Sequence, residues 1–192
     1  MRLDNIKKAL ENAAMQVLIQ ARANLSVSKA WKQNDGSVRQ KRIDASGQLY
    51  KSLKFTPVQE KNGKLSMEFL MEFYGKFIDQ GVSGTAHSTP NPSPFSFKNS
   101  GVGGSMQESI LQWIKNKNLR LRDLETGKFK KGTPQQYKSL AYVIGRSVKR
   151  KGINQTYFIS GPFGIMEKQL PAILQKALKA DVEQYLKEQF EK

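Results

Sequence analysis

Few residues of this 192-residue chain are of a type that does chemistry, and they lie far apart. The single histidine, His87, lies in a stretch rich in proline, serine and threonine, where a lone histidine is usually neither a base nor a ligand. Glu68 and Glu72 could pair as carboxylates, but on an alternating strand this spacing places them together on an exposed face. Asp79 stands alone. We therefore predict no catalytic pair and no metal site.

The known motifs for nucleotide, phosphate and acyl chemistry are also missing. Five glycines between residues 81 and 104 lack the strand–turn–helix context of a dinucleotide site, and there is no Gly-x-Ser-x-Gly, no phosphate-binding Gly-Lys-Ser/Thr and no ladder of aspartates. The absence of cysteine excludes disulfides, thiolate catalysis and the commonest zinc sites, and suits a reducing cytosol. The sequence predicts a protein that is not an enzyme and has no cofactor.

Positive charge is the strongest feature of the composition. Thirty-two Lys and Arg stand against sixteen Asp and Glu, a formal net charge of +16, which implies a polyanionic partner. Residues 115–131 carry seven basic and two acidic side chains, and a second basic cluster covers 146–151. Residues 167–192 are balanced, with five of each sign. No run approaches the ~20 apolar residues of a membrane span, so we predict no membrane contact.

Apolar periodicity predicts a helix at each end of the chain. Between Leu3 and Leu25 apolar residues recur every three or four positions, and a similar stripe runs from Leu170 to Leu186. Residues 26–47 are polar and basic, with turn signals, and are predicted as an exposed loop.

A hairpin is predicted next, with strands over 48–58 and 64–74 joined at Asn62-Gly63. The second strand has apolar residues at strict period two, so its apolar face is predicted to be the main core. That face comprises Met67, Phe69, Met71 and Phe73. A short strand is also expected over 156–159.

Residues 82–104 contain three prolines and several glycines, and predict an extended arm that is mobile in the isolated subunit and ordered in an assembly. Two capped helices follow. Ser105 to Glu108 and Thr133 to Gln136 are capping boxes, and the second has proline at the first helical position. We expect helices over 105–117 and 134–151.

These elements predict an α+β fold, a small antiparallel sheet covered by the N- and C-terminal helices. Residues 1–192 are predicted to form a single domain that carries the 82–104 arm and a helical insertion over 105–152.

Four local segments together resemble the small neck proteins of tailed bacteriophages, the tail-completion or head–tail joining family. Ala45 to Leu53 (ASGQLYKSL) is similar to that family's threonine-glycine-x-leucine element, and Tyr74 to Gly81 (YGKFIDQG) to its tyrosine-aromatic-acidic-glycine element. Residues 140–152 are similar to a basic helix of the larger members. Phe158 to Phe163 (FISGPF) stands where the family carries a late proline-phenylalanine element.

The resemblance implies a structural virion protein, assembled in the host cytoplasm, that forms a ring of twelve or six copies between the portal connector and the tail. Its partners would be copies of itself, the connector and tail proteins, and DNA bound without sequence preference. Subunit contacts are expected at Phe77, Ile78, Gly81, Phe95 and Phe97. Residues expected to face a polyanion, either the passing DNA or an acidic neighbouring ring, are Lys128, Lys130, Lys131, Lys149, Arg150 and Lys151.

Two other classes of protein remain open from the sequence. The charge also suits a free basic nucleic-acid-binding protein, for which Trp31, Trp113 and Tyr137 would offer stacking surfaces. An interaction module of the toxin or chaperone kind is the other alternative.

Overall fold

The protein has an α+β fold, as predicted, with two long helices packed together and several small two-stranded antiparallel sheets. The computed structural model describes residues 2–27, 29–32, 36–41, 43, 46–123 and 125–191. The chain divides into two compact units. The first comprises Met1–Trp31, Val38–Asp79 and Thr156–Lys192, and the second Lys32–Ser37 and Gln80–Gln155. The predicted arm and helical insertion both belong to the second unit.

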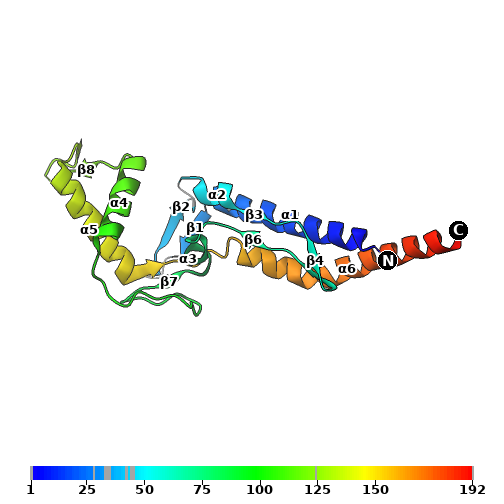
Figure 1. Cartoon of the computed structure of the whole chain (residues 1–192). Coiled ribbons are helices and arrows are strands. Elements are labelled where there is room, and N and C mark those ends of the chain that lie inside the picture. The colour runs from blue at the N-terminus through cyan, green and yellow to red at the C-terminus, as the bar shows by residue number, and fades with distance from the viewer. Residues whose placement is uncertain are drawn as a thin grey trace. The chain divides into compact units, whose positions relative to one another are not determined.

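The first unit is built on helices α1 (Asp4–Ser26) and α6 (Ser160–Phe190), which lie side by side and run antiparallel (Figure 1). Hydrogen bonds tie both ends of the pair. The backbone N–H of Asn5 donates to Asp181 Oδ1 at 2.9 Å, and Asn24 Nδ2 donates to the carbonyl of Phe158 at 3.1 Å. Both terminal helices were predicted from their apolar periodicity, and both are confirmed.

Asp181 of α6 caps the start of α1. Its carboxylate is 3% exposed and accepts three hydrogen bonds, from the backbone and side-chain nitrogens of Asn5 at 2.9 Å and from the Ile6 N–H at 3.1 Å. These N–H groups belong to the first turn of a helix, where they have no partner within the helix and where a negative charge is favourable. Because α1 begins beside Asp181, residues 182–190 of α6 continue past the start of α1, and they are exposed.

The predicted hairpin is present, but it begins differently. Strand β3 (Lys54–Phe55) pairs with β6 (Phe69–Leu70), and β4 (Gln59–Lys61) pairs with β5 (Lys64–Ser66) around a turn in which Asn62 and Gly63 both have positive φ. Residues predicted as the start of the first strand instead form a short helix, α2 (Gln48–Ser52). Leu49 and Leu53 are four residues apart, a spacing that suits one face of a helix as well as one face of a strand. A pair of short strands, β1 (Lys29–Lys32) and β2 (Val38–Lys41), precedes them.

The main core of this unit is not the predicted sheet face. It is a cluster of fully buried apolar side chains from α1, α2 and the segment before α6, namely Leu18, Ala21, Leu25, Leu49, Leu53 and Phe158. Met71 packs against it, and Phe69 contacts the rings of Phe55 and Phe163 at centroid distances of 6.3 and 5.9 Å. Phe73 is 71% exposed, so the prediction was wrong there. The reason is that β6 ends at Leu70 and the period-two alternation ends with it.

The second unit contains helices α4 (Gly104–Asn116) and α5 (Pro134–Lys151), which lie side by side (Figure 1) and are joined through strands β8 (Leu121–Arg122) and β9 (Phe129–Lys130). The capping box at Thr133 and Gln136 is confirmed. The box predicted at Ser105 does not form, because α4 begins one residue earlier with Gly103 at its N-cap. Ile114, Ala141 and Gly145 are buried where the two helices meet.

The arm of residues 82–104 packs on the C-terminal end of α5, and its mobility in the isolated subunit stays a prediction. Strand β7 (Val82–Ser83) pairs with β10 (Gly152–Ile153), and the N–H groups of Thr85 and Ala86 donate to the carbonyls of Lys149 and Arg150, both at 3.0 Å. Farther along, the N–H of Asn91 donates to Gln155 Oε1 at 3.1 Å. The bonds from Thr85 and Ala86 fill carbonyls of the last turn of α5, which have no partner within the helix.

Gly81, at the start of this arm, has little room for a side chain and a backbone conformation that favours glycine. Its φ is +71°, and an added Cβ would lie 2.8 Å from the carbonyl oxygen of Ile153 and 2.9 Å from the N–H of Gln155. We expect Gly81→Ala to destabilise the second unit by about 2–3 kcal/mol, through left-handed backbone strain and crowding.

Urea unfolding followed by Trp113 fluorescence, in chains with Trp31 replaced by phenylalanine, measures this loss. Gly103→Ala is the matched control, because nothing lies within 4 Å of its Cβ position. A loss below about 0.5 kcal/mol for Gly81→Ala, the range of an ordinary surface substitution, would contradict the expectation.

Candidate functional site

The residues that the sequence offered as possible catalytic or metal-binding groups do not form one cluster. Glu68 and Glu72 are exposed, and His87 is half-buried in the arm of the second unit. Across the part of the chain that the structure describes, no three His, Cys, Asp or Glu residues are grouped so that they could hold a metal ion.

Asp79 is the exception in burial, and its role is structural. Its side chain is 3% exposed and accepts hydrogen bonds from the N–H groups of Ile159 at 3.0 Å and Ser160 at 3.2 Å, at the start of α6. Its carbonyl accepts the N–H groups of Thr156 and Tyr157 at 3.1 and 3.0 Å. The strand predicted over 156–159 is therefore absent, since these N–H groups bond to one residue and not to a neighbouring strand. A single aspartate about 80 residues before the helix that it caps gives no signal in the sequence, so this role could not be predicted.

The expected subunit-contact residues belong to two places. Phe77 and Ile78 lie on the short helix α3 (Gly75–Gln80) in the first unit, where Ile78 packs against the core. Phe77 is half-buried and contacts the exposed ring of Phe73 at 5.6 Å, while Lys76 Nζ lies 3.8 Å from the centre of the Phe73 ring. Phe77 and Phe73 therefore form an aromatic edge on this unit, and Ile78 serves its interior.

Gly81, Phe95 and Phe97 are brought together in the second unit around β7. The N–H of Ser83 donates to the Phe95 carbonyl and the N–H of Phe97 donates to the Ser83 carbonyl, both at 2.9 Å. Gly81 is buried and the two phenylalanines are half-buried. The arm thus partly covers its own aromatic side chains, which the sequence had suggested were held by a neighbour.

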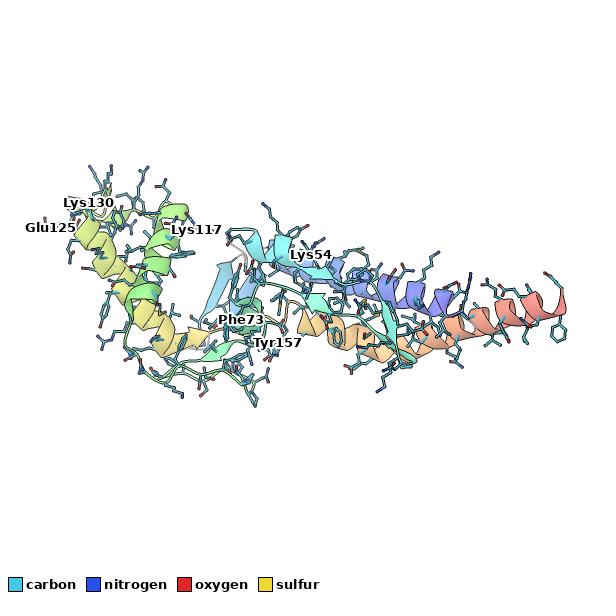
Figure 2. All side chains as sticks on the ribbon, in the orientation of Figure 1. Lys54, Phe73, Lys117, Glu125, Lys130 and Tyr157 are labelled. Atoms are coloured by element: carbon cyan, nitrogen blue, oxygen red, sulfur yellow. The ribbon has the colours of Figure 1, made fainter. Side chains whose placement is uncertain are left out.

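Lys128, Lys130 and Lys131 lie on or beside the β8–β9 hairpin, where all three are exposed. Figure 2 shows Lys130 at the same end of the α4–α5 pair as Lys117 and Glu125. Lys130 forms an ion pair with Asp123 at 2.7 Å. This hydrogen bond, followed by those from the N–H groups of Thr126 and Glu125, holds the pKa of Asp123 well below its usual range.

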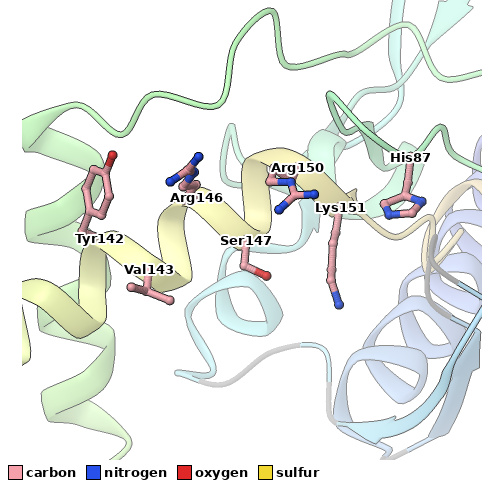
Figure 3. Close-up of a pocket in the computed structure, with 7 residues that line it drawn as sticks. All are labelled: His87, Tyr142, Val143, Arg146, Ser147, Arg150 and Lys151. Atoms are coloured by element: carbon pink, nitrogen blue, oxygen red, sulfur yellow. The ribbon is translucent and has the colours of Figure 1, made fainter.

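The basic residues at the end of α5 point in different directions. The ammonium group of Lys149 turns toward the arm, where it contacts the side chain of Asn99 and the carbonyl of Gly101. Arg150 and Lys151 instead line a cavity of about 420 Å³, together with His87, Tyr142, Val143, Arg146 and Ser147 (Figure 3). The sequence predicted the basic cluster, but it did not show that Lys149 faces the arm while Arg150 and Lys151 line the cavity.

A row of exposed apolar side chains runs along the C-terminal half of α6. Leu178, Val182, Tyr185, Leu186 and Phe190 recur every three or four residues and are 37–85% exposed. The sequence predicted most of this row as part of an apolar stripe facing the core. Most of it is exposed because α6 continues past the start of α1, which lies beside Asp181, so α1 does not reach residues 182–190.

Comparison of the chain with protein-family models, with curated proteins and with solved structures gives no match. Among the described helices, none combines the length and apolar character of a membrane span.

Proposed function

We propose that this protein is a structural subunit of a tailed-bacteriophage neck, where copies form a ring that joins the portal connector to the tail and surrounds the DNA passage. The sequence resemblance suggests the family. The observation that carries the proposal is the amount of surface, and of apolar surface in particular, that one chain leaves uncovered.

One chain exposes 13365 Å² of accessible surface. A compact monomer of 21.7 kDa is expected to expose roughly 9,200 Å², and two separate compact units of these sizes roughly 11,100 Å². The chain therefore exposes more surface than two separate compact units of these sizes would. Such an excess is typical of a subunit whose elements are completed by neighbours.

Large apolar side chains are exposed in both units. Phe73, Ile165 and Phe190 in the first unit are 71%, 63% and 85% exposed, and Val143 and Phe129 in the second are 61% and 65% exposed. Single exposed apolar residues are ordinary, but rows such as that on α6 mark interaction surfaces. A ring subunit needs at least two such surfaces, one for each neighbour.

Charge supports the same proposal. Copies of a +16 chain repel one another in a ring unless a polyanion neutralises them. DNA in a passage has to slide, so contacts at phosphate range without base recognition are the suitable kind. Lys128 and Lys131, which are exposed on a hairpin, fit that role.

The mass of the assembled particle tests the proposal. Native mass spectrometry of the purified chain, alone and with connector rings, should give a closed ring of six or twelve copies. A chain that stays monomeric at every concentration, with or without connector rings, would exclude the ring.

A salt titration of duplex DNA binding distinguishes the proposed neck protein from a free nucleic-acid-binding protein. Tight binding by the monomer, with a steep decline of log affinity against log salt, favours the alternative. Binding that appears only with the ring supports the neck protein.

Lys128→Glu/Lys131→Glu should leave the fold unchanged and weaken DNA retention by the ring, lowering the salt slope by about one unit for each phosphate that the hairpin no longer neutralises. Circular dichroism checks the fold and filter binding checks the slope. Lys168→Glu/Lys176→Glu on α6 is the matched control, with the same charge change on exposed lysines. An equal effect in both variants would mean that net charge alone acts and that this hairpin has no specific role.

A further inference from the structure

The cavity on α5 is bordered by two parallel rows of side chains from one helix. Tyr142, Arg146 and Arg150 form one row at four-residue spacing, and Val143, Ser147 and Lys151 form the next (Figure 3). His87 of the arm closes one end. Val143 is 61% exposed and Tyr142 is 43% exposed. The result is an apolar floor, formed by Tyr142 and Val143, beside the cationic groups of Arg146, Arg150 and Lys151.

The two arginines of the first row have no acidic residue on their own helix. No Asp or Glu occurs between Pro134 and Lys151. Within the described residues, no hydrogen bond or ion pair engages the guanidinium of Arg146 or Arg150. Both groups are therefore available to an external anion.

The apolar floor decides which anion fits. A phosphate backbone would use the arginines but would leave the side chains of Val143 and Tyr142 uncovered. An aromatic side chain next to a carboxylate would contact both the apolar floor and the arginines. Its ring would cover the floor, and the carboxylate would pair with a guanidinium group. Interfaces are generally built in this way, with an aromatic anchor in a pocket and charge pairs at the rim.

The chain itself carries a segment of this chemistry at the end of α6. Residues 181–191 contain four acidic residues and one basic residue, Lys187, in a protein that is otherwise strongly basic. Phe190 is 85% exposed, and in the sequence Glu188 and Glu191 lie on either side of it. This segment also continues the exposed apolar row on α6, beyond the point at which α1 begins.

We propose that the cavity on α5 receives the end of α6 from a second copy of this chain. Phe190 covers Val143 and Tyr142, and Glu191, which follows it at the end of α6, pairs with the guanidinium group of Arg146. The contact joins two different surfaces, so it repeats from copy to copy and closes a ring if the rotation allows. The inference rests on the proposed ring and names the contact that builds it.

Cross-linking tests the contact directly, because the natural chain has no cysteine. Chains carrying Ser147→Cys are mixed with chains carrying Gln189→Cys and oxidised, and covalent pairs are identified by mass spectrometry. Ser147 lines the cavity and Gln189 adjoins Phe190, so neither the apolar anchor nor a charge is altered. Gln169→Cys, an exposed glutamine on the same helix, is the matched control.

We expect a mixed pair between the S147C and Q189C chains, at least about tenfold more abundant than the pair between S147C and Q169C. No enrichment over the Q169C control would overturn the proposed contact. The mass of the particle in the same samples separates the two ideas. Rings without the mixed cross-link overturn this contact alone, whereas a lasting monomer overturns the ring as well.

Charge reversal provides the second measurement. Arg146→Glu and Glu191→Arg should each weaken self-association at least about tenfold, and mixing the two variants should restore it. Loss of DNA binding by the arginine variant with unchanged self-association would assign the cavity to nucleic acid and overturn the proposal.

Discussion

Replacement of Phe158 by alanine should lower the free energy of unfolding of the first unit by about 3–5 kcal/mol. The side chain is 0% exposed and belongs to the cluster formed by α1 and α2 with Leu25, Leu49 and Leu53. Removal of the ring leaves a cavity between elements that are distant in the sequence, so little of it should close by relaxation. Urea unfolding followed by circular dichroism, which reports mainly α1 and α6, measures the change.

Phe73→Ala is the control for this substitution. It removes the same side chain from a position that is 71% exposed, and we expect a loss below about 1 kcal/mol. If Phe73→Ala proved as costly as Phe158→Ala, the core would lie on the sheet face that the sequence favoured, and the packing described here would be wrong.

The misplaced core shows what periodicity leaves undetermined. Alternation between Leu65 and Phe73 correctly predicted extended chain and the antiparallel pairing, because side chains of a strand alternate between its two faces. It did not reveal where the strand ends. Leu49 and Leu53 were predicted to lie on one face of a strand, yet their four-residue spacing is equally that of a helix, and packing against α1 decided in favour of the helix.

Composition alone also did not show where the arm packs. Its prolines and glycines give it no core of its own, from which mobility was predicted. The last turn of α5, however, offers the carbonyls of Lys149 and Arg150, and the N–H groups of Thr85 and Ala86 bond to them. Local composition describes what a segment lacks, whereas the acceptors lie about 65 residues farther along the chain.

The position of the basic site in the chain could be predicted, but the directions in which its side chains point could not. Lys149, Arg150 and Lys151 are consecutive, and consecutive side chains on a helix point about 100° apart. One of them therefore turns to the arm while the next two border the cavity. The signal that the sequence did offer is the four-residue spacing of Tyr142, Arg146 and Arg150, which places an aromatic ring and two guanidinium groups in one row.

Asp79→Ala should have a comparably large effect on the stability of the first unit, about 3–5 kcal/mol. Two N–H groups at the start of α6 would lose a charged acceptor in a buried place, and each such bond contributes about 1.5–3 kcal/mol. Asp79→Asn is the matched control. It keeps an acceptor oxygen in the same position, so most of the stability should remain.

Hydrogen exchange shows where the effect of Asp79→Ala acts. The amides of Ile159 and Ser160 should exchange much faster in the alanine variant, and those of α5 should be unchanged, because every hydrogen bond described for Asp79 lies within the first unit. Uniformly faster exchange in both units would show that Asp79 stabilises more than the start of α6.

The position of Asp79 in the chain favours the local effect. The chain leaves the first unit after Asp79 and returns to it at Thr156, and the carbonyl of Asp79 accepts the N–H groups of Thr156 and Tyr157 on that return. Alanine retains this carbonyl, so the two ends of the segment that forms most of the second unit stay joined in the variant, and Tyr157 keeps its positive φ of 48°. A left-handed backbone at a tyrosine costs free energy, and the bonds to the Asp79 carbonyl, which offset that cost, are present in both variants.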